Sequence, residues 1–203
     1  MTSYLVHPDP LDLPAPDQTK WSPLQLAAWK SPEMEAFREG LRLRGLPDIR
    51  SAVLDDLSSY FKVDEERCIH LARHSVELSA KEWFAADRSN QESVTDYYLN
   101  VYSYMFGILW YAYLQAEGHA YSETVAVGRD LHYCMAAKSK VLDFGSGDGP
   151  AAQMFIELGY EVTLADISTP MLDFARYRLE RRGTAPKFIN LNEASLATCT
   201  KSL

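Results

Sequence analysis

The stretch KVLDFGSGDGPAAQMFIELGYEVTLADIS, residues 140–168, decides the fold of the C-terminal part of the chain. A short apolar run ends at three glycines on alternate positions, Gly145, Gly147 and Gly149. A segment that begins at Pro150 and closes with glycine follows, as expected for a helix, and a second apolar run then leads to a lone acidic residue, Asp166. The pattern predicts a strand, a helix and a second strand.

The residues that follow repeat this alternation. STPMLDFARYRLERRG (168–183) predicts a helix that ends in glycine, and KFINLN (187–192) predicts a third strand. Strands that alternate with helices indicate a parallel sheet, so the expected fold class is α/β, with a Rossmann-like sheet behind a helical bundle. We interpret four arginines of this segment as a solvated helix face: Arg176, Arg178, Arg181 and Arg182.

The residues before this region divide into an arm and a helical part. Residues 1–22 contain four prolines, which disfavour a regular helix and predict an extended arm. The pattern from 23 to 137 is helical and predicts a bundle of about six helices. We therefore expect three parts: the arm (1–22), the helical region (23–137) and the sheet region (138–203).

Composition limits the environment and the partners of the chain. The 203 residues carry a formal net charge of −8, which argues against nucleic acid as a partner. Three widely spaced cysteines without a C-x-x-C pair favour a reducing compartment, and the N-terminus lacks the pattern of a signal peptide. The most apolar run, MFGILWYAYL (105–114), is too short to span a membrane. We expect a cytoplasmic protein without a membrane partner.

The glycine loop is a candidate ligand site. In an open parallel sheet, ligands bind beyond the carboxyl ends of the strands, and glycine lets a ligand approach the backbone without meeting a Cβ. Asp166 follows about twenty residues later, where a carboxylate accepts hydrogen bonds from a ribose. The dinucleotide pattern G-x-G-x-x-G needs glycine at position 150, where this chain has Pro150, so a nicotinamide dinucleotide is disfavoured.

The two motifs together resemble a known family. VLDFGSGDG resembles the first motif of the class I S-adenosylmethionine-dependent methyltransferases, and VTLADIS resembles their acidic second-strand motif. The resemblance covers residues 138–196 and implies S-adenosylmethionine as the cofactor. It also implies a small-molecule or peptide-derived acceptor, with the helical region serving as a lid and as the acceptor side.

The resemblance assigns roles to individual residues. It implies that the backbone of Gly145, Ser146 and Gly147 contacts the amino-acid part of S-adenosylmethionine. Asp143 would support the loop and the ammonium group of the cofactor, and Asp166 would hold the ribose hydroxyls.

Further positions of the motif would contact the adenine. Ile167 and Met171 would flank the ring, and Asn192 or Glu193 is a looser candidate for contact with its amino group. The methyl group of the cofactor is already activated, so the protein chiefly aligns the reactants and a general base is not compulsory.

Catalytic residues are less well marked. His132 stands shortly before the glycine loop and is a candidate base, and Tyr104 belongs to a tyrosine-rich segment expected near the ligand. His70 and His74 lie four residues apart, but no second cluster completes a set of metal ligands, so no metal is expected.

The sheet region is short for this family. A complete family sheet has about seven strands, and at about 30 residues for each strand–helix–strand unit it needs more chain than residues 141–203 provide. We expect a truncated domain, a homodimer or partner chain that completes the sheet, or an unusual reduced version of the fold. The alternative to an enzyme is a non-catalytic methyltransferase-like binding module.

Overall fold

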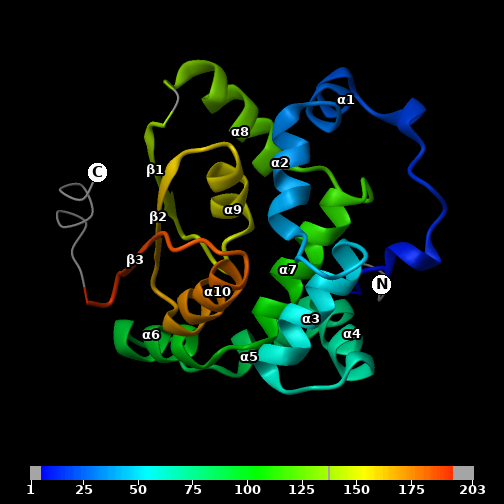
Figure 1. The fold of residues 1–203 in the computed structure, drawn as a ribbon. Helices are drawn as coiled ribbons and strands as arrows, with labels where there is room; N and C mark the ends of the chain where they lie inside the picture. Colours follow the sequence, from blue (N-terminus) through cyan, green and yellow to red (C-terminus); the bar gives the residue numbers. More distant parts are fainter. Residues whose placement is uncertain (1–5, 137, 194–203) are drawn as a thin grey trace.

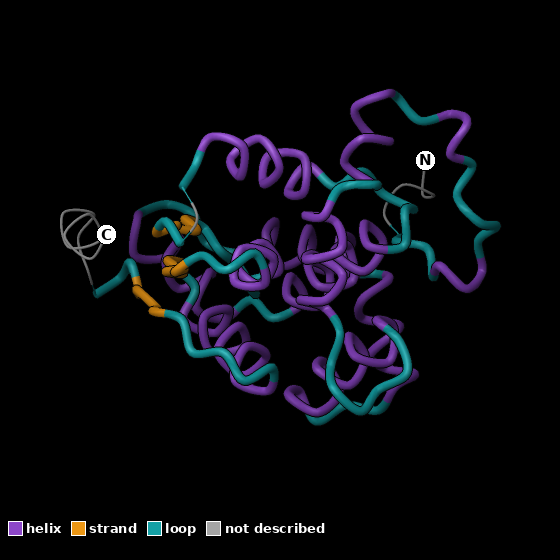
Figure 2. Tube along the Cα trace, turned by 45° about the horizontal axis from the view of Figure 1, so that its top comes forward, coloured by secondary structure: helices purple, strands orange, loops and turns teal. Residues whose placement is uncertain are grey.

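The computed structural model describes residues 6–136 and 138–193. Helices form one side of the molecule, and a small sheet with two further helices forms the other (Figure 1). Figure 2 shows the strands gathered at one end of the molecule and the N-terminal arm at the opposite end. The fold class is therefore α/β, as the sequence predicts.

The described part of the chain before the sheet contains eight α-helices, more than the six expected. The additional helices arise because two expected segments are divided, one at His74 and the other at Val101 and Tyr102. Two short 3-10 turns, Pro10–Asp12 and Gln18–Lys20, interrupt the expected extended arm. The helices are α1 (Pro23–Trp29), α2 (Pro32–Leu41), α3 (Ile49–Phe61), α4 (Glu65–Arg73), α5 (Ser75–Ala85), α6 (Gln91–Asn100), α7 (Ser103–Ala116) and α8 (Glu123–Cys134).

Local capping explains where several of these helices begin. The hydroxyl groups of Ser22 and Ser31 accept hydrogen bonds from backbone N–H groups in the first turns of α1 and α2, and a proline follows each serine. The Asp48 carboxylate does the same for α3. No described helix has both the length and the apolar character that crossing a membrane requires.

The sheet has three parallel strands in the order β1-β2-β3. They are β1 (Lys140–Phe144), β2 (Glu161–Asp166) and β3 (Lys187–Asn190), with α9 (Pro150–Glu157) and α10 (Thr169–Arg181) between them. The register pairs Phe144 with Ala165 and Asp166 with Asn190, so the carboxyl ends of the strands lie at one edge.

Helix α7 is the centre of the helical part. Its side chains Met105, Leu109 and Trp110 are fully buried. The Trp110 Nε1 donates a hydrogen bond of 2.9 Å to the Pro8 carbonyl, which holds the N-terminal arm against this helix. The helical part meets the sheet region mainly through α2 and α9, which lie side by side in Figure 1.

A buried ionic cluster also joins the two parts of the molecule. Asp56 of α3 has no exposed surface and binds three arginines of α10 and its C-terminal end, at 3.2 Å to Arg178, 2.7 Å to Arg181 and 2.8 Å to Arg182. The interpretation of these arginines as a solvated face is wrong for Arg178 and Arg182, whose side chains are only 2% and 5% exposed. The periodicity of α10 could not reveal this, because the carboxylate partner lies 122 residues earlier.

Removal of the Asp56 carboxylate should destabilise the protein strongly. Asp56→Ala leaves buried guanidinium groups without their counter-charge, and we expect a loss of about 3–5 kcal/mol in the free energy of unfolding. Asp55→Ala is the matched control, because Asp55 binds Arg181 from a partly exposed position and should cost about 1 kcal/mol or less. Urea denaturation measures both, and equal losses would contradict the assigned role of Asp56.

Candidate functional site

A cavity of about 990 Å³ opens where the carboxyl ends of β1 and β2 meet the helical part. Its walls come from the glycine loop, from the starts of α9 and α10, and from α5, α6, α7 and α8. All of the residues predicted to bind the cofactor line it: Asp143, Gly145, Ser146, Gly147, Asp166, Ile167 and Met171.

The glycines of the loop serve two different purposes. Gly145 has φ +73°, and a Cβ added there would meet no atom within 4 Å. Gly149 has φ +79°, and its Cβ would lie 3.0 Å from a methyl carbon of Leu164 in the core. Gly145 therefore leaves open space for a ligand, whereas Gly149 allows the loop to pack closely against β2 and the helix behind it.

Asp166 holds the loop in place. Its Oδ2 accepts a hydrogen bond of 2.9 Å from the Gly147 N–H, and its Oδ1 accepts one of 2.8 Å from the Ser168 N–H. Each carboxylate oxygen has a further lone pair, so the side chain retains the capacity to bind a hydroxyl group in the cavity.

Asp143 is the most perturbed acid in the cavity. Burial raises the pKa of Asp143 to about 6; the Ala152 N–H acts in the opposite direction, and the charge of Asp166 adds to the rise. Its Oδ2 and the Ser146 Oγ are buried and have no hydrogen-bond partner within the described residues. A cationic donor in the cavity would satisfy both the acid and the hydroxyl.

The backbone carbonyl of Asp148 anchors the loop from behind, whereas its two carboxylate oxygens have no hydrogen-bond partner within the described residues. Its side chain is fully buried, and burial raises the pKa of Asp148 to about 7, although nearby Arg178 opposes the shift. Arg178 Nη1 donates a hydrogen bond of 2.6 Å to the Asp148 carbonyl. The ionic cluster on α10 therefore also fixes the glycine loop.

Helices α6 and α7 cover the loop. The Ile108 side chain of α7 lies 3.4 Å from the position that a Gly147 Cβ would take. The Ser168 hydroxyl donates a hydrogen bond of 2.9 Å to the Tyr98 carbonyl at the end of α6. Tyr98 and Tyr104 line the cavity, which places the predicted Tyr104 at the site.

Other predicted residues lie elsewhere. His132 of α8 makes a 2.7 Å hydrogen bond with the Tyr160 hydroxyl and does not line the cavity. Asn192 donates a hydrogen bond to the Ile167 carbonyl, and Glu193 accepts one from Asn190. Within the described ranges no group of three or more metal-ligating side chains occurs.

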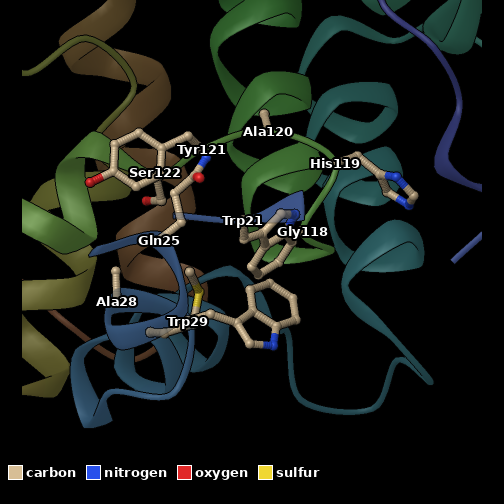
Figure 3. A pocket seen from close by; sticks show the side chains of 10 residues that line it. Trp21, Gln25, Ala28, Trp29, Gly118, His119, Ala120, Tyr121 and Ser122 are labelled. Atoms are coloured by element: carbon tan, nitrogen blue, oxygen red, sulfur yellow. The ribbon is translucent and has the colours of Figure 1, made fainter. Parts of the chain in front are cut away.

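A second cavity, of about 140 Å³, lies apart from the glycine loop (Figure 3). Trp21 and Trp29 form its aromatic wall, with ring centroids 5.2 Å apart at 80°. The Trp29 ring would lie 2.9 Å from a Cβ on Gly118, so close packing of α1 against the turn after α7 shapes this space. None of its lining residues belongs to the predicted site.

Several residues of the large cavity escaped sequence reasoning. His7 comes from the arm, Ser75 and Trp83 from α5, and Glu123 from the first turn of α8. They are far from the glycine loop in sequence and share no spacing pattern, so only the packing of the helices brings them together.

Comparison with known proteins agrees with the geometry of the loop. Residues 141–202 match the family model of a methyltransferase domain. This segment is therefore similar to a methyltransferase domain, over less than half of the chain. The matched segment includes most of β1, the glycine loop and Asp166, while the helices before β1 lie outside it. No curated protein and no solved structure matches the chain significantly.

The raised pKa of Asp143 predicts a pH-dependent stability. An aspartate normally titrates near pH 3.8, so between about pH 4 and 6 the folded protein binds more protons than the unfolded chain. The free energy of unfolding therefore falls as the pH rises through this interval, and Asp143 contributes about 3 kcal/mol to the fall. Asp143→Asn should remove this loss, so the variant gains on the wild type as the pH rises from 4 to 7.

Urea denaturation at pH 4, 5, 6 and 7 measures this effect. Asp130→Asn, at an exposed position of α8, is the control and should leave the pH profile unchanged. A profile of Asp143→Asn that parallels the wild type would show that Asp143 does not titrate as described.

Proposed function

We propose that the protein is an S-adenosylmethionine-dependent methyltransferase that acts on a small-molecule or peptide-derived acceptor. The observation that carries this proposal is the convergence, on one cavity, of an open glycine cradle and two buried polar atoms without partners. Such orphaned groups cost stability and fit a site that a ligand completes. The methyltransferase family match of the same segment supports this choice of ligand.

The residues of the cavity suit the parts of S-adenosylmethionine. Asp143 would hold the ammonium group, and the backbone around Gly145 and Gly147 would hold the carboxylate end. Asp166 would accept hydrogen bonds from the ribose, and the apolar side chain of Met171 would pack on the adenine. When bound, the cofactor supplies a methyl group on a positively charged sulfur.

The helical part would exclude water and position the acceptor. A cavity of about 990 Å³ is at the upper end of the range for small-molecule sites, which leaves room for an acceptor beside the cofactor. Tyr104 remains our candidate from the tyrosine-rich segment for contact with the reactants. The alignment of the acceptor with the methyl group would provide most of the rate enhancement.

A second proposal concerns the edge of the sheet. Within the described residues β1 pairs with β2 alone, and Phe144 at its end is 57% exposed. We propose that a further strand, from a second copy or a partner chain, pairs with this edge. Light scattering of the purified chain tests for a homodimer.

The alternative function is a non-catalytic binding module. Binding of the cofactor without turnover would favour it.

Loss of the Asp166 carboxylate should weaken cofactor binding. Asp166→Ala removes the bonds to ribose and the support of Gly147, and we expect S-adenosylhomocysteine to bind about 5- to 150-fold more weakly. Glu161→Gln, at the exposed start of the same strand, is the control and should bind normally. Calorimetric titration measures both affinities, and unchanged binding by Asp166→Ala would remove Asp166 from the site.

A side chain at Gly145 should block the proposed cofactor site without lowering thermal stability more than a comparable glycine substitution elsewhere. Gly145→Ala and Gly159→Ala both place a Cβ at a positive φ with no atom within 4 Å, so their backbone strain is similar. Gly145 alone of the two lines the cavity. We expect similar thermal stability, with S-adenosylhomocysteine binding reduced at least about tenfold for Gly145→Ala only. Equal binding by the two variants would contradict the proposed position of the ligand.

A further inference from the structure

The cavity has two ends, and α7 runs between them. Helix α6 lies at the end of the cavity near Asp166, because the Tyr98 carbonyl in its last turn accepts a hydrogen bond from the Ser168 hydroxyl. Figure 1 shows α6 beside α10 and α8 toward the opposite end of the molecule. Glu123, in the first turn of α8, lies beside the C-terminal part of α7, because Gln115 Nε2 donates a hydrogen bond of 3.4 Å to its Oε2.

The spacing along α7 gives the same order. Ile108 lies over Gly147, and Tyr111 and Gln115 follow on the same face at about 4.5 and 10 Å along the axis. Tyr104 lies one turn earlier, toward α6. The wall beyond the glycine loop thus consists of Tyr111 and Gln115.

Two groups, His7 and Glu123, lie near Tyr111 at this end, and Gln115 holds Glu123. The His7 ring lies 5.9 Å from the Tyr111 ring, centroid to centroid. Burial raises the pKa of Tyr111, and the charge of Glu123 adds to the rise, so this carboxylate lies near the phenol. Gln115 Nε2 donates a hydrogen bond of 3.0 Å to the Tyr121 carbonyl and approaches Glu123 Oε2 at 3.4 Å.

The backbone holds His7 firmly at this position. Its N–H donates a hydrogen bond of 2.7 Å to the Arg73 carbonyl, and Arg73 Nε donates one of 3.2 Å to the His7 carbonyl. The next residue, Pro8, accepts the hydrogen bond from Trp110. Burial lowers the pKa of His7, so its imidazole is neutral near pH 7.

The charges at this cavity have one sign. Among the described residues, those that line it include Asp143, Asp166 and Glu123 but no lysine and no arginine. Glu123 forms no ion pair within the described ranges, and the two aspartates already serve the proposed cofactor site. An anionic acceptor would find no counter-charge here, whereas a cationic one would find the Glu123 carboxylate beside aromatic rings.

We propose that His7, Tyr111 and Glu123 form an acceptor subsite for a small amine, and that His7 removes the proton that frees the amine for methylation. This inference rests on the proposed methyltransferase function and specifies its substrate class. Glu123 would attract the ammonium form, and the aromatic ring of Tyr111 would pack on the carbon skeleton.

The ammonium form of the acceptor gives one proton to the neutral His7 imidazole and becomes an amine with a free electron pair. The amine nitrogen then forms a bond to the methyl carbon, while the bond from sulfur to methyl breaks and leaves its electron pair on sulfur. The products are a methylated ammonium ion, S-adenosylhomocysteine and protonated His7.

Binding measurements test the subsite independently of turnover. The wild-type chain, saturated with S-adenosylhomocysteine, is titrated with 2-phenylethylamine and with 3-phenylpropanoate, which share the aromatic skeleton but differ in charge. We expect the amine to bind at least about tenfold more tightly, and Glu123→Gln to lower its affinity at least about fivefold. Glu117 lies near the end of α7 and outside the cavity, so Glu117→Gln should leave the affinity for both ligands unchanged.

The outcomes separate this proposal from the one on which it rests. If S-adenosylhomocysteine fails to bind the folded wild-type chain, the proposed function itself is contradicted. If it binds but the amine does not, or if the carboxylate binds equally well, only the amine subsite is overturned.

The role of His7 has its own test. His7→Gln should keep its affinity for S-adenosylhomocysteine and for 2-phenylethylamine, while methylation of the amine at pH 7 falls at least about 100-fold. Raising the pH toward 10 should restore much of the rate, because the amine then loses its proton to solvent. The charged groups that these contacts place near His7 are Arg73 of α4, which binds the His7 carbonyl, and Glu123, which lies near Tyr111. A rate deficit that persists at high pH would overturn the role of His7 as base.

Discussion

The buried guanidinium group of Arg178 connects the parts of this molecule on which the cavity depends. It binds the Asp56 carboxylate of α3 and the Asp148 carbonyl of the glycine loop, while its own helix, α10, packs on β2. A buried charge is costly unless its partners are in place, so these groups have little freedom to separate. The position of the loop relative to the helical part follows from this constraint.

The loop held in this way shapes one wall of the cavity, and the helices supply the other. Gly149 packs the loop onto the core, which leaves Gly145 and its neighbours facing open space. Asp143 Oδ2 and Ser146 Oγ, which line the cavity, are buried and have no hydrogen-bond partner within the described residues. Buried polar atoms without partners lower the stability of the folded protein, and a ligand that forms hydrogen bonds with them would restore it.

The sheet and the donor side of the site could be predicted because their signals are local. Glycine spacing, a strand end and a single acid lie within 29 consecutive residues, and short-range sterics determine how they are arranged. The helical wall could not be predicted, since His7 and Glu123 meet at Tyr111 only after the arm and α8 have packed around α7. Arg178 was expected to be solvated for the same reason, because its partner Asp56 is remote in sequence. His132 was expected near the glycine loop, but its side chain instead makes a hydrogen bond with Tyr160.

The central claim is that the cavity at the glycine loop binds S-adenosylmethionine. Calorimetric titration of the wild-type chain with S-adenosylhomocysteine, with NAD as the comparison ligand, tests it most directly. We expect saturable binding of one S-adenosylhomocysteine per chain and no saturable binding of NAD. Binding of NAD instead, or the absence of S-adenosylhomocysteine binding by a chain shown to be folded, would contradict it.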